Sequence, residues 1–120
     1  MVITMEELNS LVSRYFHGDE GYNCYQTVLK ILQIKNPALN ITEDDINKGR
    51  QFGGGRAPEG LCGALFATLK NAKDGQEHQI FKEKFSSYFN NEITCKGIKG
   101  QRIFSCNDCV LNALKVFFEK

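Results

Sequence analysis

The chain has 120 residues, of which 42% are hydrophobic and 24% are charged, and its formal net charge is +1. This length predicts one domain, residues 1–120, with enough apolar surface for a single core. The balance of 15 basic and 14 acidic residues gives no reason to expect a nucleic acid or an anionic membrane as a partner. No stretch approaches the ~20 apolar residues of a membrane span.

The first residues, 1–7, contain neither the basic segment nor the long apolar segment of a secretory signal. We therefore expect a cytoplasmic location, where disulfides are usually transient or catalytic. The odd number of cysteines, 5, agrees with this expectation, because secreted disulfide scaffolds usually have an even number.

Capping signals and apolar periodicity predict the first three helices. Thr4 and Glu7 form a capping box before a helix that ends near residue 17. Asn23 and Gln26 form a second capping box, before a helix that ends near residue 36. A third and more polar helix is expected over residues 42–51, with acidic residues in its first turn.

The second half of the chain follows a glycine-rich loop at residues 52–60. We expect a fourth helix from about residue 61, a fifth over 76–89 and a last one from Ser105, which forms a capping box with Asp108. Residues 94–97 are expected to form a short turn. Few segments alternate with a period of two, so the expected class is all-α: a compact single-domain bundle of about five to six helices, with the loop before the central cysteine helix.

Cysteines stand at the predicted starts of four helices, where unpaired N–H groups and the positive end of the helix dipole favour a thiolate. Thiolate is the reactive and the metal-binding form of cysteine. These candidate site residues are Cys24, Cys62, Cys95 and Cys106.

Helical spacing places three of these cysteines on core-facing stripes. Cys62 aligns with Leu65, Phe66 and Leu69, Cys106 with Val110, Leu114 and Phe117, and Cys24 with Val28 and Ile31. If the helices pack around one core, their sulfurs could meet as a dithiol–disulfide relay or a metal cage. The alternative is that the cysteines only fill the core, because free cysteine often behaves as a small hydrophobe.

Cys106 and Cys109 form a CxxC motif at a helix start. In thioredoxin-like proteins this arrangement lowers the pKa of the first thiol. The negative charge of Asp108 opposes a nearby thiolate, so we expect modest activation. A zinc site usually needs a second such pair or two histidines at regular spacing, and the chain has neither.

The glycine loop offers a second candidate site, at Gly53, Gly54, Gly55 and Arg56. Backbone N–H groups of such a loop before a helix could bind an anion or a cofactor phosphate. The loop lacks the Lys and Ser or Thr of a P-loop, and the simpler interpretation is a tight turn. Arg56 could also lower the pKa of Cys62.

Several segments resemble one protein family. Residues 21–29, GYNCYQTVL, are similar to its N-terminal signature, and residues 52–55 and 60–64 to its glycine loop and its CGA motif. With Cys95 and Cys106 as the last two cysteines, residues 16–118 resemble the C_GCAxxG_C_C family of redox-active proteins. The resemblance implies that Cys24, Cys62, Cys95 and Cys106 are the characteristic cysteines and that Cys109 is an extra one. The chain departs from the pattern at Ala67, where the motif has Gly, and at Tyr25, where it has a small residue.

These observations predict a redox-active cysteine protein, an enzyme of the thiol–disulfide oxidoreductase class or an electron-transfer protein. The attacking thiolate is assigned to Cys62 or Cys106, a second converging cysteine resolves the product, and the partner is a redox protein or a small thiol. This interpretation requires no cofactor. One alternative is a zinc or iron–sulfur protein that uses four thiolates, Cys24, Cys62, Cys95 and Cys106. Another is a non-catalytic helical interaction module.

Overall fold

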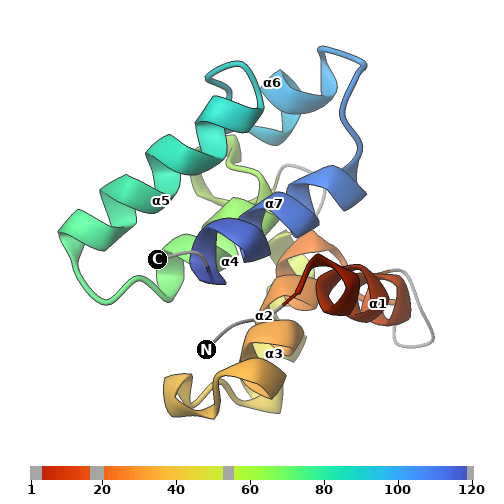
Figure 1. Cartoon of the computed structure of the whole chain (residues 1–120), viewed down its shortest axis with the longest axis vertical. Helices are drawn as coiled ribbons and strands as arrows, with labels where there is room; N and C mark the ends of the chain where they lie inside the picture. The colour runs from red at the N-terminus through yellow and green to blue at the C-terminus, as the bar shows by residue number, and fades with distance from the viewer. Residues whose placement is uncertain (1–3, 17–20, 53–55, 119–120) are drawn as a thin grey trace.

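The structure, a computed structural model, describes residues 4–16, 21–52 and 56–118. These residues form seven α-helices and no β-strand (Figure 1): α1 (Met5–Tyr15), α2 (Cys24–Lys35), α3 (Glu43–Lys48), α4 (Gly63–Lys70), α5 (Gly75–Tyr88), α6 (Cys95–Lys99) and α7 (Cys106–Phe118). Short 3-10 segments are η1 (Pro37–Leu39), η2 (Gly49–Phe52) and η3 (Pro58–Gly60). The all-α prediction is confirmed. The helix count exceeds the predicted five to six because residues 95–99 form α6, where only a short turn at residues 94–97 was expected.

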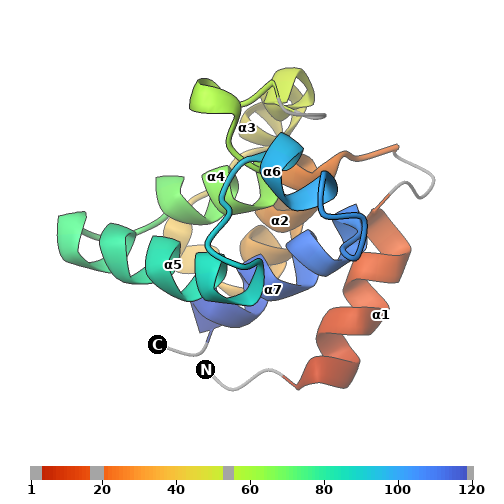
Figure 2. The same cartoon turned by 90° about the horizontal axis from the view of Figure 1, so that it is seen from above.

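The core is built around α2, which packs against both α4 and α7, with α1 and α5 on the outside (Figures 1 and 2). Leu32 of α2, Leu65 of α4 and Leu114 of α7 are all fully buried. At the end of α5, Tyr88 is exposed, and Phe89, which follows it, is buried. The Cα radius of gyration is 12.9 Å, close to the ~14 Å expected of one domain of this length.

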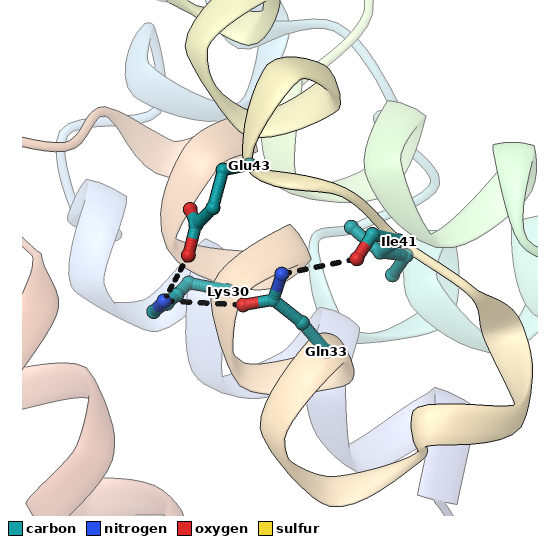
Figure 3. A network of polar contacts seen from close by, with 4 residues as sticks. All are labelled: Lys30, Gln33, Ile41 and Glu43. Carbon is teal, nitrogen blue, oxygen red and sulfur yellow. Dashed lines mark hydrogen bonds and ion pairs between the residues drawn. The ribbon is translucent and has the colours of Figure 1, made fainter.

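A polar network holds the segment before α3 against the middle of α2 (Figure 3). Lys30 Nζ donates to Glu43 Oε1 at 2.9 Å and to Gln33 Oε1 at 3.1 Å. Gln33 Nε2 donates to the Ile41 carbonyl oxygen at 3.0 Å. This network fixes the C-terminal half of α2, and at the N-terminal end the side chains of Asn23 and Gln26 donate to the carbonyl oxygens of Gly49 and Ile46. Of the described helices, none is both long enough and apolar enough to cross a bilayer.

Candidate thiol site

Four cysteines stand at helix starts, as the capping signals predict. Cys24, Cys95 and Cys106 are the first residues of α2, α6 and α7. Cys62 is the N-cap of α4, one residue before the helix rather than inside its first turn. Each thiol therefore lies near the positive end of a helix.

Capping residues immediately before three of these cysteines set their positions. The Asn23 side chain accepts from the N–H of Gln26 at 2.8 Å, which completes the predicted capping box. Thr94 Oγ1 accepts from the Gly97 N–H at 2.9 Å. Ser105 N–H donates to Asp108 Oδ2 at 2.8 Å, so the Asp108 carboxylate is held at the helix start. These caps fix where Cys24, Cys95 and Cys106 begin their helices.

A short backbone pairing brings α6 to the start of α4. Leu61 and Thr94 form an isolated antiparallel bridge, and the N–H of Cys62 donates to the Ile93 carbonyl oxygen at 2.9 Å. As a result α6 lies beside the ends at which α4 and α7 begin (Figures 1 and 2). This long-range contact places Cys95 near the thiols of the other helices.

Gly63 allows the starts of α2 and α4 to lie against each other. A Cβ at position 63 would be 3.0 Å from the Phe52 carbonyl oxygen and 3.3 Å from the Tyr25 nitrogen. Gly63 follows Cys62 and Tyr25 follows Cys24, so the backbone segments that carry these two cysteines lie close to each other. Close packing of backbone against backbone at the thiol site therefore explains why the CGA segment has glycine at position 63.

None of the five cysteines is in a disulfide, and four of them form two hydrogen-bonded pairs. Cys24 is hydrogen-bonded to Cys106, and both are partly exposed; we call them the outer pair. Cys62 is hydrogen-bonded to Cys109, and each is only 3% exposed; we call them the inner pair. Each pair joins a separate helix start, that of α2 or of α4, to α7.

The two cysteines of the CxxC motif therefore bond to different partners. The sequence interpretation left Cys109 without a role, yet it contacts Cys62 directly. Helical spacing could have indicated that Cys109 faces the core, because it lies on one face of the helix with Ala113 and Val116, at i+4 and i+7, which are also buried. This face of α7 packs in the core against the neighbouring helices, and Cys109 is part of it.

Hydrogen bonding separates proton donors from acceptors in these pairs. The hydrogen bond from Cys109, aided by the backbone N–H groups of Leu65 and Ala64, lowers the pKa of Cys62 although the thiol is buried. The same bond, and burial, raise the pKa of Cys109. In the outer pair, the hydrogen bond to Cys106 and burial raise the pKa of Cys24. Cys62 is therefore the thiolate-forming member of the inner pair, and Cys24 and Cys109 stay protonated.

Lys99 is a cation of the thiol site that sequence reasoning missed. Its Nζ donates to Cys106 Sγ at 3.4 Å, and that hydrogen bond raises the pKa of Lys99. An ammonium group beside a sulfur favours the thiolate. Arg56, which the sequence suggested for the Cys62 thiol, donates from Nη2 to the Arg50 carbonyl oxygen at 3.4 Å. The structure therefore places a cation, the Lys99 ammonium group, beside Cys106.

Cys95 is the fifth thiol, half-buried at the start of α6. Burial is the main cause that raises the pKa of Cys95. The negative charges of Cys62 and Cys106 raise this pKa further, and the positive charge of Lys99 lowers it. All four predicted site cysteines are thus brought to one end of the helices, together with Cys109.

The metal and anion predictions have a different outcome. Within residues 4–16, 21–52 and 56–118 there is no group of three or more His, Cys, Asp or Glu side chains placed to hold a metal ion. The predicted ligand set is arranged around two hydrogen-bonded pairs rather than as one cage, although thiolates are the ligands that zinc and iron–sulfur clusters prefer. Gly53, Gly54 and Gly55 of the predicted anion loop lie outside the described residues.

A cavity of about 300 Å³ lies apart from the thiols, with Tyr25, Phe52 and Lys70 in its wall and no cysteine. The Tyr25 ring packs against Phe52, with 4.9 Å between ring centroids, and Lys70 Nζ lies 5.8 Å from the Tyr25 ring centroid. The large residue that follows Cys24 therefore turns its ring into this aromatic cluster.

Comparisons of the chain with family models, curated proteins and solved structures find no match. The resemblance to the C_GCAxxG_C_C family therefore stays a prediction from the sequence. The function has to be argued from the thiol site itself.

Proposed function

We propose that this protein carries out thiol–disulfide exchange, one form of the redox activity that the C_GCAxxG_C_C resemblance implies, with the outer pair as its reacting dithiol. One observation carries the proposal: Cys24 and Cys106 are hydrogen-bonded across two helices and partly exposed, with Lys99 on the Cys106 sulfur. A thiolate beside a protonated thiol is the arrangement that dithiol exchange requires. The sequence left Cys62 and Cys106 as candidate nucleophiles, and we assign Cys106 because Cys62 is 3% exposed.

The reaction oxidises the protein and reduces a partner disulfide. The Cys106 thiolate attacks one partner sulfur, the partner S–S bond breaks, and the other partner sulfur leaves as a thiolate. The Cys24 thiol then gives its proton to water and attacks Cys106 Sγ. The first partner sulfur leaves as a second thiolate, and the Cys24–Cys106 disulfide forms. Two electrons have passed to the partner, and the reverse sequence oxidises a partner dithiol.

The partner approaches a basic surface that surrounds Cys106. Lys96, Lys99 and Arg102 are exposed, and Ile103 is 67% exposed. The acidic residues that flank this segment are Glu92 and Asp108, and the Asp108 carboxylate accepts from the Ser105 N–H. A small disulfide or a redox protein with an acidic surface fits this combination of charge and apolar contact. The surface gives Cys106 a route to a partner that Cys62 and Cys109 lack.

The test starts from reduced protein purified without oxygen and uses hydroxyethyl disulfide as the oxidant. With excess oxidant, mass spectrometry should find a Cys24–Cys106 disulfide, and Cys24→Ser combined with Cys109→Ser should accumulate a mixed disulfide on Cys106. Cys106→Ser should react at least about 100-fold more slowly at the outer pair, because a serine hydroxyl does not ionise near neutral pH. Cys95→Ser is the matched control and should keep the wild-type rate. An unchanged rate in Cys106→Ser would refute the assignment.

The same purification tests the alternatives. Brown protein that contains iron would indicate a cluster, and colourless protein that contains zinc would indicate a structural metal site; either would replace the exchange proposal, because the thiols would be ligands. Metal-free protein with a measurable two-electron potential supports exchange. Metal-free protein whose native thiols are inert would indicate that the cysteines only pack the core.

A further inference from the structure

The inner pair takes no part in the proposed exchange with a partner. Cys62 and Cys109 are each 3% exposed, so a partner disulfide cannot reach either sulfur in the folded protein. Yet the two thiols face each other across two elements, as the outer thiols do. A second dithiol of this kind needs an oxidant from inside the molecule.

The geometry of α7 supplies the connection between the pairs. Cys106 and Cys109 are three residues apart on one helix, so their Cβ atoms lie on neighbouring turns about 5–6 Å apart. Cys24 is bonded to the first of them and Cys62 to the second. The outer and inner pairs are therefore stacked along α7.

A second contact brings the partners of α7 together independently. The missing side chain at Gly63 lets the start of α4 approach the Tyr25 nitrogen of α2. Cys62 and Cys24 are the residues immediately before Gly63 and Tyr25. The helix starts that carry Cys24 and Cys62 are thus held against each other, and each of these cysteines is hydrogen-bonded to a cysteine of α7.

We propose that the inner pair is an internal two-electron store, and that a disulfide formed at the outer pair is passed to it through a Cys106–Cys109 disulfide of the CxxC motif. The inference rests on the proposed function, because exchange at the outer pair supplies the oxidising equivalents. The protein then holds two dithiols that act in sequence, and one chain can deliver four electrons.

The transfer is an internal exchange that needs no further reagent. Cys109 sulfur attacks Cys106 Sγ of the outer disulfide, its proton passes to the Cys62 thiolate through their hydrogen bond, and Cys24 leaves as a thiolate. Cys62 then gives its proton to the Cys24 thiolate and attacks Cys109 Sγ. The Cys106–Cys109 bond breaks, and Cys106 leaves as a thiolate beside Lys99.

The products carry the same number of protons and charges as the reactants: one disulfide, one thiol and one thiolate. The disulfide is now buried, and the exposed pair is a dithiol again. The outer pair can therefore react with a second partner disulfide while the inner disulfide is shielded from small thiols in solution. Because only the outer pair is accessible to reagents in solution, oxidising equivalents enter at the outer pair and are held at the buried inner pair.

The experiment follows which disulfide forms over time. Reduced protein receives one equivalent of hydroxyethyl disulfide, is quenched at intervals with acid and alkylated, and is cut before Asp108 so that Cys106 and Cys109 fall on separate peptides. The Cys24–Cys106 disulfide should appear first and decline while the Cys62–Cys109 disulfide grows. With excess oxidant, each chain should release four electrons and contain both disulfides.

Three variants isolate the transfer step. Cys109→Ser should form the outer disulfide and keep it, which shows that the fold and the first exchange survive. Cys106→Ser should form the inner disulfide at least tenfold more slowly than wild type, and Cys95→Ser should behave as wild type. Wild-type kinetics of the inner disulfide in Cys106→Ser would overturn the store.

A wild-type outer disulfide that persists, with no inner disulfide formed, would also overturn the store but would leave the proposed function intact. Absence of the outer disulfide from wild-type protein in excess oxidant, where both disulfides should be present, would instead overturn the proposed function itself. The two proposals therefore fail by different observations. The wild-type time course decides between them without relying on the folding of any variant.

Discussion

The outer and inner thiol pairs use the same chemistry in two environments. Each joins a helix start to α7 through a hydrogen bond between sulfurs. The outer pair is partly exposed, and the inner pair is 3% exposed at both thiols. Burial, rather than a difference in the reacting groups, therefore separates a dithiol that can meet a partner from one that can react only inside the molecule.

The pairs also differ in what stabilises a thiolate. In the outer pair it is the exposed ammonium group of Lys99, 3.4 Å from Cys106 Sγ. In the inner pair it is the Cys109 thiol and the backbone N–H groups at the start of α4. Salt screens an exposed charge pair but has little access to buried dipoles. A thiolate is thus stabilised by an exposed cation in the outer pair, which salt screens, and by buried dipoles in the inner pair, which salt does not reach.

The largest expected difference between the pairs is in alkylation. Anaerobic reduced protein treated with iodoacetamide at neutral pH should be modified at Cys106, while the inner pair reacts more slowly by a factor on the order of a thousand, because its thiols react only when the fold opens. Peptide mass spectrometry measures both rates. Denatured protein is the control and should show similar rates at all five cysteines. Equal rates in the folded protein would remove the distinction between the pairs.

The second prediction concerns the protons that both pairs hold. The pKa values of Cys24 and Cys109 are raised in the folded protein. Above pH ~8.5 these two thiols therefore stay protonated in the folded state, whereas the same two thiols ionise in the unfolded chain. The unfolded state then binds fewer protons, so the free energy of unfolding should fall by about 1.4 kcal/mol per pH unit for each thiol between about pH 8.5 and 10.

Cys62 contributes with the opposite sign in a lower range. Its lowered pKa adds stability as pH rises toward the unfolded value of ~8.5, and the gain is constant above that pH. Urea unfolding of the reduced protein at a series of pH values measures the slope. Cys109→Ser should reduce the fall seen in alkaline solution, whereas Cys95→Ser, at a more exposed thiol, should change it less. Stability that does not fall above pH ~8.5 would contradict the proton assignment.

Local sequence signals predicted where the cysteines stand in the helices. A capping residue lies next to Cys24, Cys95 and Cys106, so the position of each helix start is encoded within a few residues. The helical stripes likewise predicted buried faces of α2, α4 and α7, although Cys24 and Cys106, which were placed on two of these stripes, are partly exposed. These properties depend on neighbours in the sequence, and the structure confirms them.

The identity of the partners depends on contacts that no local pattern encodes. The bridge between Leu61 and Thr94 joins residues 33 positions apart, and it brings α6 with Lys99 to the site. Because the sequence predicted only a turn at residues 94–97, it gave Lys99 no role. The pairing of Cys109 with Cys62 likewise requires the packing of α4 against α7, which single-chain periodicity cannot supply.

A third prediction sharpens the comparison by separating the pairs in space. In Gly63→Ala the new Cβ would meet two backbone atoms, the Phe52 oxygen at 3.0 Å and the Tyr25 nitrogen at 3.3 Å. Backbone atoms cannot rotate away, so the variant should lose about 1–3 kcal/mol of stability. The start of α4 should shift from that of α2, and transfer to the inner pair should slow.

Gly75→Ala is the matched control for this change. Gly75 is also the first residue of a helix, and a Cβ there would have no neighbour within 4 Å. Urea unfolding should therefore give a stability within about 0.5 kcal/mol of wild type, as for most exposed substitutions. Equal stability in both variants would show that the close approach at Gly63 does not hold the two helix starts together.

The smallest expected effect tests the cation of the outer pair alone. Lys99→Gln removes the ammonium group from Cys106 but keeps a side chain of similar length. An exposed ion pair contributes up to about 1 kcal/mol, so the outer pair should react with iodoacetamide roughly three- to fivefold more slowly at neutral pH. The inner pair, whose thiolate is held by backbone N–H groups and Cys109, should keep its rate.

Salt and a neighbouring lysine distinguish this local effect from a general change of charge. In wild-type protein, raising the salt concentration should slow the outer pair toward the rate of Lys99→Gln, because the Debye length shrinks to ~3 Å at 1 M. The variant itself should respond less. Lys96→Gln, on the same helix and with the same change of net charge, should slow the outer pair less than Lys99→Gln does. If both variants slow it equally, the 3.4 Å contact with Cys106 has no special role and the outer pair feels only the surface potential.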